Sequence, residues 1–440
     1  MRIRTLLLCT GLLLILSSCK ETSTYSWEED LHARLLRDFD KTQAQIITQI
    51  QEYIPNVTSE QLRTWEESKA LEYMVLDGEK RYFHNATPNL FRIDSACHVV
   101  KYGFAPIPAQ KDSDNVVNIP EIISSVKSSG NPIAAPKRMR VTYTLTVNAD
   151  AVPEGEILRC WLPYPRRDVA RQQDVRLISA CEPTYVISPV EYRHSTLYME
   201  KTAVAGTPTV FSECFEFTSC GEWIPSLRDK VLPYDTSNDI CKEYTSGREQ
   251  HVVFTPRLRA LADSLTSGID NPYLKARNIF QWIHSNIPWA SAREYSTMEN
   301  IPLYVLENGH GDCGMKSLLL ITLCRLCGIP AHFQSGFMLH PHEVNLHDWA
   351  ELYFEGVGWV PVDMSFGIPG FAANDEQKWF YLGGIDSWRL IVNNDFGMPL
   401  FPPKKYPRSE TVDFQRGEVE WSGGNLYFDS WSWHIDVEYL

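Results

Sequence analysis

The stretch that decides the fold of this chain reads GHGDCG (309–314), followed by HDWAE (347–351) and GWVPVD (358–363). These blocks place a thiol, an imidazole and a carboxylate in that order along the chain, on Cys313, His347 and Asp363. Cysteine acyl-transfer chemistry requires these three groups as nucleophile, base and orienting acid. The order and the local context of the three residues therefore predict an enzyme.

The cysteine of the first block stands at the start of a predicted helix. The apolar run 314–327 ends at Gly328 and Pro330, as helices commonly do. A helix N-terminus carries partial positive charge and free N–H groups, which favour a thiolate, and the N–H of Cys313 itself would stabilise an oxyanion. The pattern therefore predicts a nucleophilic cysteine with a lowered thiol pKa.

The base and the acid belong to two neighbouring predicted strands. His347 lies just before the strand 349–354, and Asp363 ends the strand 358–362. The turn 355–358 would make these strands antiparallel neighbours and set His347 beside Asp363. The carboxylate would then fix the imidazole tautomer and stabilise the imidazolium.

Together with CRLCGIPA (324–331) and SGF (335–337), these blocks closely resemble the core of the bacterial transglutaminase-like family. The resemblance covers about residues 255–400, and its motifs lie within 309–367. It implies a papain-like fold with a Cys-His-Asp triad formed by Cys313, His347 and Asp363. The preceding β-rich region, with WLPYP at 161–165, is similar to the β-domain that precedes this core in bacterial members.

The resemblance also implies a side-chain donor in the oxyanion hole. Trp282 and Trp289 lie in the expected region upstream of Cys313 and are the two candidates. Each of them also fits a packing aromatic, and the sequence does not choose between them.

The periodicity of the chain predicts an α+β, multidomain fold. Residues 19–135 form a mainly helical N-terminal region, with a helix start at 58–60 and a linker over 111–136. Residues 136–245 alternate as short strands and predict a β-sandwich. We assign 246–440 to the papain-like, transglutaminase-like catalytic core, with a C-terminal strand within 425–440.

The N-terminus has the features of a targeting segment. Arg2 and Arg4 precede an apolar run over 6–16, which ends in LSSC (16–19). This resembles a bacterial lipoprotein signal, with a signal peptide over 1–18 and lipid attached to Cys19. We therefore expect a lipid-anchored protein of the bacterial cell envelope, held at the outer membrane and facing the periplasm or the surface.

Composition excludes several classes of protein. A net charge of −14 and the lack of a basic patch argue against nucleic-acid binding. Cys324 and Cys327 sit one helical turn apart and fit core packing better than zinc, and HPHE (340–343) lacks a metal-binding spacing. We expect no metal and no cofactor.

These observations favour an enzyme that hydrolyses peptide or amide bonds through a thioester acyl-enzyme. The same triad would serve a protein-glutamine γ-glutamyltransferase, in which an amine acceptor replaces water. A third alternative is a non-catalytic module that binds glycan or peptide and carries a vestigial triad. The expected partners are a peptide or protein substrate, an amine acceptor in the second case, and a membrane reached through the lipid anchor.

Overall fold

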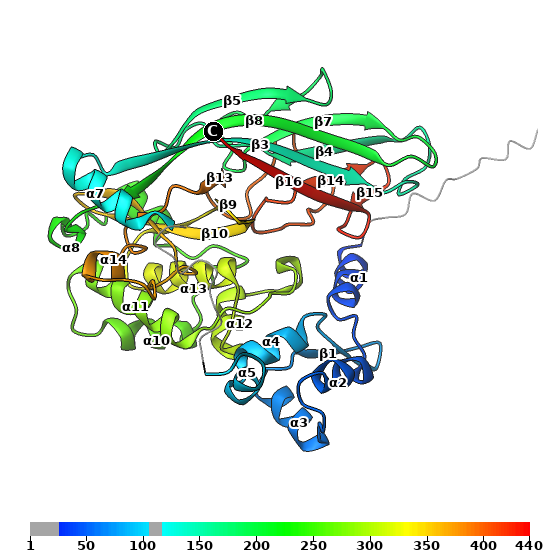
Figure 1. Cartoon of the computed structure of the whole chain (residues 1–440), viewed down its shortest axis with the longest axis horizontal. Coiled ribbons are helices and arrows are strands. Elements are labelled where there is room, and N and C mark those ends of the chain that lie inside the picture. The colour runs from blue at the N-terminus through cyan, green and yellow to red at the C-terminus, as the bar shows by residue number, and fades with distance from the viewer. Residues whose placement is uncertain (1–25, 105–116) are drawn as a thin grey trace, which may run out of the picture.

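The computed structural model describes residues 26–104 and 117–440. It confirms an α+β, multidomain architecture, arranged as a helical N-terminal unit, a layer of core helices, a four-stranded sheet and a β-sandwich (Figure 1). The predicted signal peptide 1–18, the predicted lipidation site Cys19 and part of the predicted linker, 111–116, lie outside the described residues.

The N-terminal unit is a set of short helices around a hairpin. Both Thr42 and Thr58 form capping boxes, with Gln45 and Gln61 respectively, and the predicted helix start at 58–60 is confirmed because α3 begins at Ser59. The unit has its own apolar core. Its elements are α1 (Trp27–Asp38), α2 (Gln43–Gln51), α3 (Ser59–Glu67), β1 (Tyr73–Leu76), β2 (Glu79–Tyr82), α4 (Ala86–Ile93) and α5 (Ser95–Tyr102).

The predicted linker over 111–136 is wrong from residue 119 onward. Helix α7 (Ile119–Ser129) occupies this segment, and its buried Ile122, Ile123 and Val126 form an apolar stripe. Pro120 lies in the first turn, where a proline costs a helix nothing, so the proline and serines that suggested a linker are compatible with a helix.

The sandwich consists of two five-stranded sheets whose alternating residues face a shared core. In β3, every second residue from Met139 to Val147 is buried. The first sheet contains β12 (Gly384–Ile385), β8 (Thr209–Trp223), β3 (Ile133–Val147), β16 (Trp431–Tyr439) and β5 (Gln172–Ala180), which pairs with β8. The second contains β15 (Gly424–Leu426), β14 (Glu418–Trp421), β4 (Ile157–Pro163), β7 (Thr196–Thr202) and β6 (Val186–Ile187).

The C-terminal strands complete the sandwich, and not the catalytic core to which the sequence assigned them. β16 pairs with β3 along its whole length, from Trp431 opposite Val147 to Tyr439 opposite Met139. β14 pairs with β4. The alternation within 425–440 correctly predicts a strand, but alternation does not reveal which strand is its partner.

The region predicted to be the catalytic core packs helices against the four-stranded sheet β11-β10-β9-β13. Helix α13 is buried over almost its entire length, as its apolar sequence requires. The sheet consists of β9 (Ala331–His340), β10 (Glu343–Phe354), β11 (Gly358–Val362) and β13 (Arg389–Asn393). The helices are α8 (Leu227–Lys230), α9 (Asp239–Tyr244), α10 (Pro256–Thr266), α11 (Pro272–Asn286), the 3₁₀ turn η1 (Tyr295–Thr297), α12 (Ile301–Asn308), α13 (Cys313–Leu326) and α14 (Asp375–Lys378).

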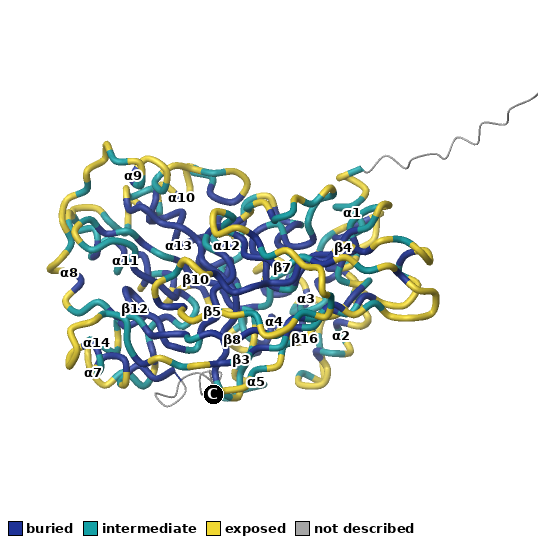
Figure 2. Tube along the Cα trace, turned by 90° about the horizontal axis from the view of Figure 1, so that it is seen from above, coloured by how far each residue is buried: buried dark blue, intermediate teal, exposed yellow. Residues whose placement is uncertain are grey.

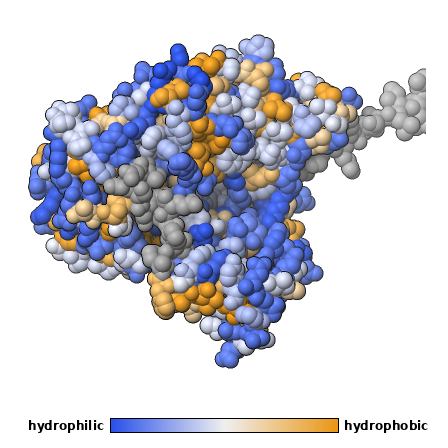
Figure 3. Space-filling model, viewed as in Figure 1, coloured by the Kyte–Doolittle hydropathy of each residue, from blue (hydrophilic) through white to orange (hydrophobic). Residues whose placement is uncertain are grey.

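Buried residues run through the centre of the molecule, along β10 and α13, while the connecting loops at the periphery are exposed (Figure 2). On the face shown in Figure 3, hydrophilic residues predominate and hydrophobic ones form small, separate groups. Within the described part of the chain, no helix combines the length and the apolar character that crossing a bilayer requires.

Candidate functional site

Cys313 is the first residue of α13, as the sequence predicts. Asp312 caps this helix and accepts a hydrogen bond from the Met315 N–H at 3.0 Å. The hydroxyl of Tyr295 donates to the same carboxylate oxygen at 2.6 Å. Gly314 is closely enclosed, since a Cβ there would lie 2.3 Å from the Tyr295 hydroxyl oxygen. Any larger residue at position 314 would therefore displace groups around the thiol.

A cavity of about 160 Å³ lies beside the thiol. It is formed where α13, β10, the segment 292–295 and the segment 409–416 meet. Its lining residues are Ala292, Arg293, Glu294, Tyr295, Asp312, Cys313, Leu346, Asp348, Ser409, Glu410, Asp413, Gln415 and Arg416.

The structure brings His347 and Asp363 together. His347 Nε2 lies 2.7 Å from Asp363 Oδ2, and both side chains are buried. His347 lies within β10 and Asp363 directly follows β11, the antiparallel neighbour of β10. The other carboxylate oxygen of Asp363 accepts hydrogen bonds from the Ser365 and Phe366 N–H groups, each at 3.0 Å. These contacts fix the carboxylate in place beside the imidazole.

Arg389 provides the positive charge next to this pair. Its Nη1 lies 2.8 Å from Asp363 Oδ2, and the same guanidinium binds Asp386. Burial raises the pKa of Asp363, but the charges of His347 and Arg389 outweigh burial and lower the pKa to about 2. Asp363 is therefore ionised at neutral pH and suited to stabilise an imidazolium.

The hydrogen bond that the structure gives to the Cys313 thiol goes to Asp348, the residue after His347. The distance from Sγ to Asp348 Oδ2 is 3.4 Å. Adjacent side chains on a strand point to opposite faces, so two neighbouring residues of β10 serve two different contacts: Asp348 meets the thiol and His347 meets Asp363. The sequence did not single out Asp348.

The electrostatic surroundings of the thiol differ from those the sequence predicts. Burial, Asp348 and Asp312 raise the thiol pKa of Cys313 well above its usual value. The helix N-terminus was expected to lower it, but its effect is outweighed by burial and by these two carboxyls. Burial together with Asp413 and Asp312 also raises the pKa of Asp348. The resting Cys313 is therefore a protonated thiol.

Lys316 lies one helical turn after Cys313 and is buried. Burial lowers its pKa to about 8, while the charges of Asp363 and Cys313 favour its protonated form. A positive charge at this position acts on both residues and would favour a thiolate as it forms. This lysine is a second site residue that sequence reasoning missed.

The long connection 394–417 between β13 and β14 contains no helix or strand and brings Gln415 to the site. Gln415 Nε2 lies within 3.0 Å of three acceptors: the carbonyl oxygens of Gly336 and His347, and Asp348 Oδ1. Gln415 therefore links the strands β9 and β10 and holds the carboxylate that meets the thiol.

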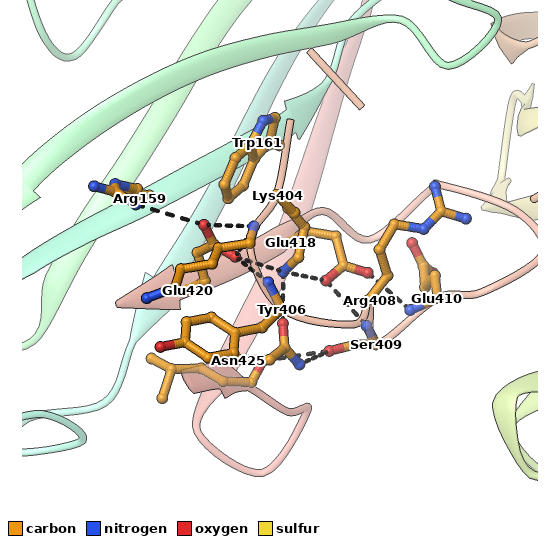
Figure 4. Close-up of polar contacts among 12 residues, drawn as sticks. Arg159, Trp161, Lys404, Tyr406, Arg408, Ser409, Glu410, Glu418, Glu420 and Asn425 are labelled. Atoms are coloured by element: carbon orange, nitrogen blue, oxygen red, sulfur yellow. Dashed lines mark hydrogen bonds and ion pairs between the residues drawn. The ribbon is translucent and has the colours of Figure 1, made fainter. Parts of the chain in front are cut away.

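Buried glutamates hold this connection in its path (Figure 4). Glu418 of β14 accepts hydrogen bonds from the Ser409 and Glu410 N–H groups at 3.0 and 2.8 Å. Glu410 in turn accepts from the Gln415 and Arg416 N–H groups at 2.7 and 2.9 Å. A continuous set of contacts thus runs from the sandwich to the cavity.

The two oxyanion-hole candidates lie outside the lining of this cavity. Trp282 lies on α11 and packs against the hydrophobic core that includes α11 and α13. Trp289 is 40% exposed, and the Arg92 guanidinium lies 4.6 Å from its ring centroid. Its backbone forms a bridge with Gly311, close to the start of α13. Their role in an oxyanion hole stays a prediction.

Residues 259–364 match the transglutaminase-like superfamily. A stretch of 130 residues is 26% identical to an uncharacterized protein, YebA, of Bacillus subtilis (strain 168), and the match covers 26% of this chain and only 18% of that protein.

Two solved structures show weaker, structural similarity. A Cytophaga hutchinsonii protein described as a "Putative Cysteine Protease" is 16% identical with a TM-score of 0.45, over 70% of this chain and 92% of that one. The periplasmic domain of TgpA from Pseudomonas aeruginosa is 16% identical with a TM-score of 0.30, over 57% and 92% respectively. Motifs and the superfamily match agree on a transglutaminase-like domain within residues 259–364 of this chain.

Proposed function

We propose that this chain is an exported, lipid-anchored cysteine acyl-transfer enzyme of the bacterial cell envelope, which hydrolyses peptide or amide bonds through a thioester on Cys313. The observation that carries the proposal is the buried His347–Asp363 pair at 2.7 Å, with His347 on β10, a strand that packs against α13. A vestigial site has no need of an ionised, buried carboxylate held by an arginine, because burying charge is costly.

Each group has a defined task in the proposed reaction. His347 donates Nε2–H to Asp363, so Nδ1 is the nitrogen that accepts the thiol proton as sulfur attacks the carbonyl carbon. The imidazolium then protonates the leaving amine, and the C–N bond breaks to give a thioester. Water attacks the thioester and loses its proton to His347, which releases a carboxylic acid and returns the thiol.

The thiol must turn from Asp348 towards His347 for this transfer. Catalytic hydrogen bonds often reach full strength only in the complex with substrate. Because Asp348 and His347 point to opposite faces of β10 here, this transfer requires the His347 ring or the strand to change position as well as the Cys313 side chain. Comparing His347→Ala with Asp348→Asn identifies which of the two accepts the proton: loss of the base abolishes acylation, whereas Asp348→Asn still forms the acyl-enzyme, at a changed rate.

The proposal favours water over an amine as the acyl acceptor, since an envelope site is exposed to water. The envelope location and the lipid on Cys19 rest on the N-terminal sequence, with its apolar run and the LSSC block. Metabolic labelling with a fatty-acid analogue tests the anchor, because Cys19→Ala should abolish labelling of the full chain.

Trapping the acyl-enzyme tests the catalytic claim. The protein is mixed with a library of short peptides, quenched in acid and analysed by intact mass, on wild type, Cys313→Ala and His347→Ala. The proposal expects an acyl adduct on the Cys313 peptide of the wild type and neither an adduct nor hydrolysis in both variants. Hydroxylamine confirms the thioester, since it diverts the acyl group to a hydroxamate and returns the thiol. An added alkylamine separates hydrolysis from transfer, since only transfer gives an N-alkyl amide in place of the free acid. Peptide binding without any adduct would instead support the binding module.

A further inference from the structure

The cavity beside Cys313 contains more carboxyl groups than the cations around it can balance. Five of its lining residues are acidic and two are basic. The acidic residues are Glu294, Asp312, Asp348, Glu410 and Asp413, and the basic ones are Arg293 and Arg416.

Both arginines have their charges engaged by glutamates. Arg416 binds Glu294 through two hydrogen bonds of 2.8 and 2.7 Å, and its Nε donates to Glu410 at 2.7 Å. Arg293 lies 3.8 Å from Glu72, which is not part of the cavity. Within the ranges that the structure describes, three carboxyls of the lining therefore remain without a cationic partner: Asp312, Asp348 and Asp413.

These three carboxyls differ in the hydrogen bonds that their oxygen atoms accept. Asp312 accepts from Tyr295 and the helix N-terminus, and Asp348 accepts from Gln415. The carboxylate of Asp413 has no hydrogen bond and no ion pair with any residue of 26–104 or 117–440, although the residue is only 8% exposed. The charge of Arg408 favours the ionised form of Asp413, but its guanidinium donates hydrogen bonds to the backbone carbonyl oxygens of Asp413 and Met398 and not to the carboxyl.

Burial and the nearby Glu410 raise the pKa of Asp413 well above its usual value, so its carboxyl is held as the neutral acid until a cation reaches it. Asp413 faces a cavity that also contains the nucleophile, and Glu418 and Glu410 hold its segment in place. A group that satisfies it must be small, because the cavity is about 160 Å³, and must donate hydrogen bonds while carrying positive charge. A primary ammonium group has this chemistry, with three donors on a compact charge.

We propose that the cavity beside Cys313 is a binding site for a primary ammonium group of the substrate, with Asp413 as the main acceptor and Asp348 as the second. The proposal rests on the proposed function and names its substrate class: a peptide or amide whose ammonium group lies close to the acyl carbon that Cys313 attacks. A cation bound there would also counter the carboxyls that now oppose ionisation of the thiol. The cognate substrate would therefore assist the formation of its own nucleophile.

Charge-selective labelling of Cys313 tests the site without requiring turnover. Methanethiosulfonate reagents with 2-aminoethyl, methyl and 2-sulfonatoethyl groups transfer a cationic, a neutral and an anionic tail to a thiol, forming an S–S bond and releasing methanesulfinate. Rates at the Cys313 peptide are followed by mass spectrometry and divided by the rates of the same reagents with a small neutral thiol.

The wild type should prefer the cationic reagent over the neutral one by at least about tenfold, because an ammonium group in the partly desolvated cavity favours ionisation of Asp413 and is attracted by the carboxylate so formed. Asp413→Asn should lose most of this preference, and Asp413→Glu should retain it. Asp436→Asn, which removes one exposed carboxylate on β16 outside the cavity, should behave as wild type. Equal rates for the cationic and neutral reagents, or no labelling by the cationic one, would overturn the site.

Two further arms distinguish the source of the ammonium group. If it belongs to the acyl donor, acetylating the N-terminus of a substrate peptide slows acylation of Cys313. If it belongs to an acyl acceptor, acetylation has no effect and a simple alkylamine accelerates deacylation. Charge-selective labelling without any acyl adduct from any peptide would retain the cation site and contradict the proposed function. An adduct that forms equally with acetylated and free peptides, and is released equally with or without amine, would support the proposed function and contradict the cation site.

Discussion

His347 Nε2 lies 2.7 Å from Asp363 Oδ2, and neither residue is more than 2% exposed. The guanidinium of Arg389 forms an ion pair with Asp363 and also donates a hydrogen bond to the buried Asp386. An imidazole in this setting has one fixed tautomer and a carboxylate ready to stabilise its protonated form. In the proposed function, the same contact serves both catalysis and stability.

Replacing Asp363 with Asn should slow acylation of Cys313 by roughly three to four orders of magnitude, because the amide cannot stabilise the imidazolium and permits the wrong tautomer. Single-turnover kinetics with a peptide substrate measures this rate. A change of less than about tenfold would show that Asp363 does not orient the catalytic base.

The stability provided by Asp363 should depend on pH in a defined direction. Its pKa of about 2 in the folded protein lies below the value of about 3.9 for an unfolded aspartate. The contribution, on the order of 2–3 kcal/mol, is fully present above about pH 5 and declines as the pH falls towards 2. Urea unfolding of wild type and Asp363→Asn should show a difference at pH 7 that narrows at pH 3. A difference independent of pH would contradict this assignment.

Removing the guanidinium behind the pair should destabilise the protein strongly. Arg389→Gln leaves Asp363 and Asp386 buried without their shared cation, a change that typically costs about 3–5 kcal/mol. Arg63→Gln is the matched control, because the Arg63–Glu67 pair on α3 is exposed and should be worth less than about 1 kcal/mol. Chemical denaturation measures both values, and similar losses for the two variants would contradict the argument.

Asp348→Asn should lower the thiol pKa of Cys313, since Asp348 is the largest charged contribution that raises it. The pH profile of iodoacetamide alkylation at the Cys313 peptide should then move towards lower pH. At a fixed pH below the thiol pKa, a tenfold larger acid dissociation constant of the thiol gives about a tenfold higher alkylation rate, because the thiolate is the reacting form. Asp436→Asn should leave the profile in place. An unchanged profile in Asp348→Asn would show that its carboxyl does not control the thiol.

The blocks around Cys313, His347 and Asp363 were sufficient to predict the helix start and the neighbouring strands, because local motifs and a tight turn determine them. The upward shift of the Cys313 thiol pKa is not predictable from the sequence, since it depends on burial and on the contact with Asp348. The motif points to the neighbouring His347 and not to Asp348. Gln415 and Asp413 belong to an irregular connection without periodicity, so only the tertiary structure places them at the site. Helix α7 was missed because its short apolar stripe lies among prolines and serines.

The contribution of the C-terminus to the sandwich can be tested by truncation. Ending the chain before Trp431 removes β16 and exposes the edge of β3 along nine residue pairs, from Trp431–Val147 to Tyr439–Met139. We expect loss of cooperative folding of the sandwich or aggregation through the exposed edge. A truncated protein with an unchanged unfolding transition would show that β16 is a dispensable tail.

The central claim is that Cys313 forms a thioester with help from His347, and intact-mass analysis of acid-quenched peptide reactions tests it most directly. The account predicts an acyl adduct on the Cys313 peptide in wild type, its disappearance in Cys313→Ala and His347→Ala, and its conversion to a hydroxamate by hydroxylamine. Peptide cleavage or binding that persists in Cys313→Ala, with no adduct in wild type at any time point, would contradict it.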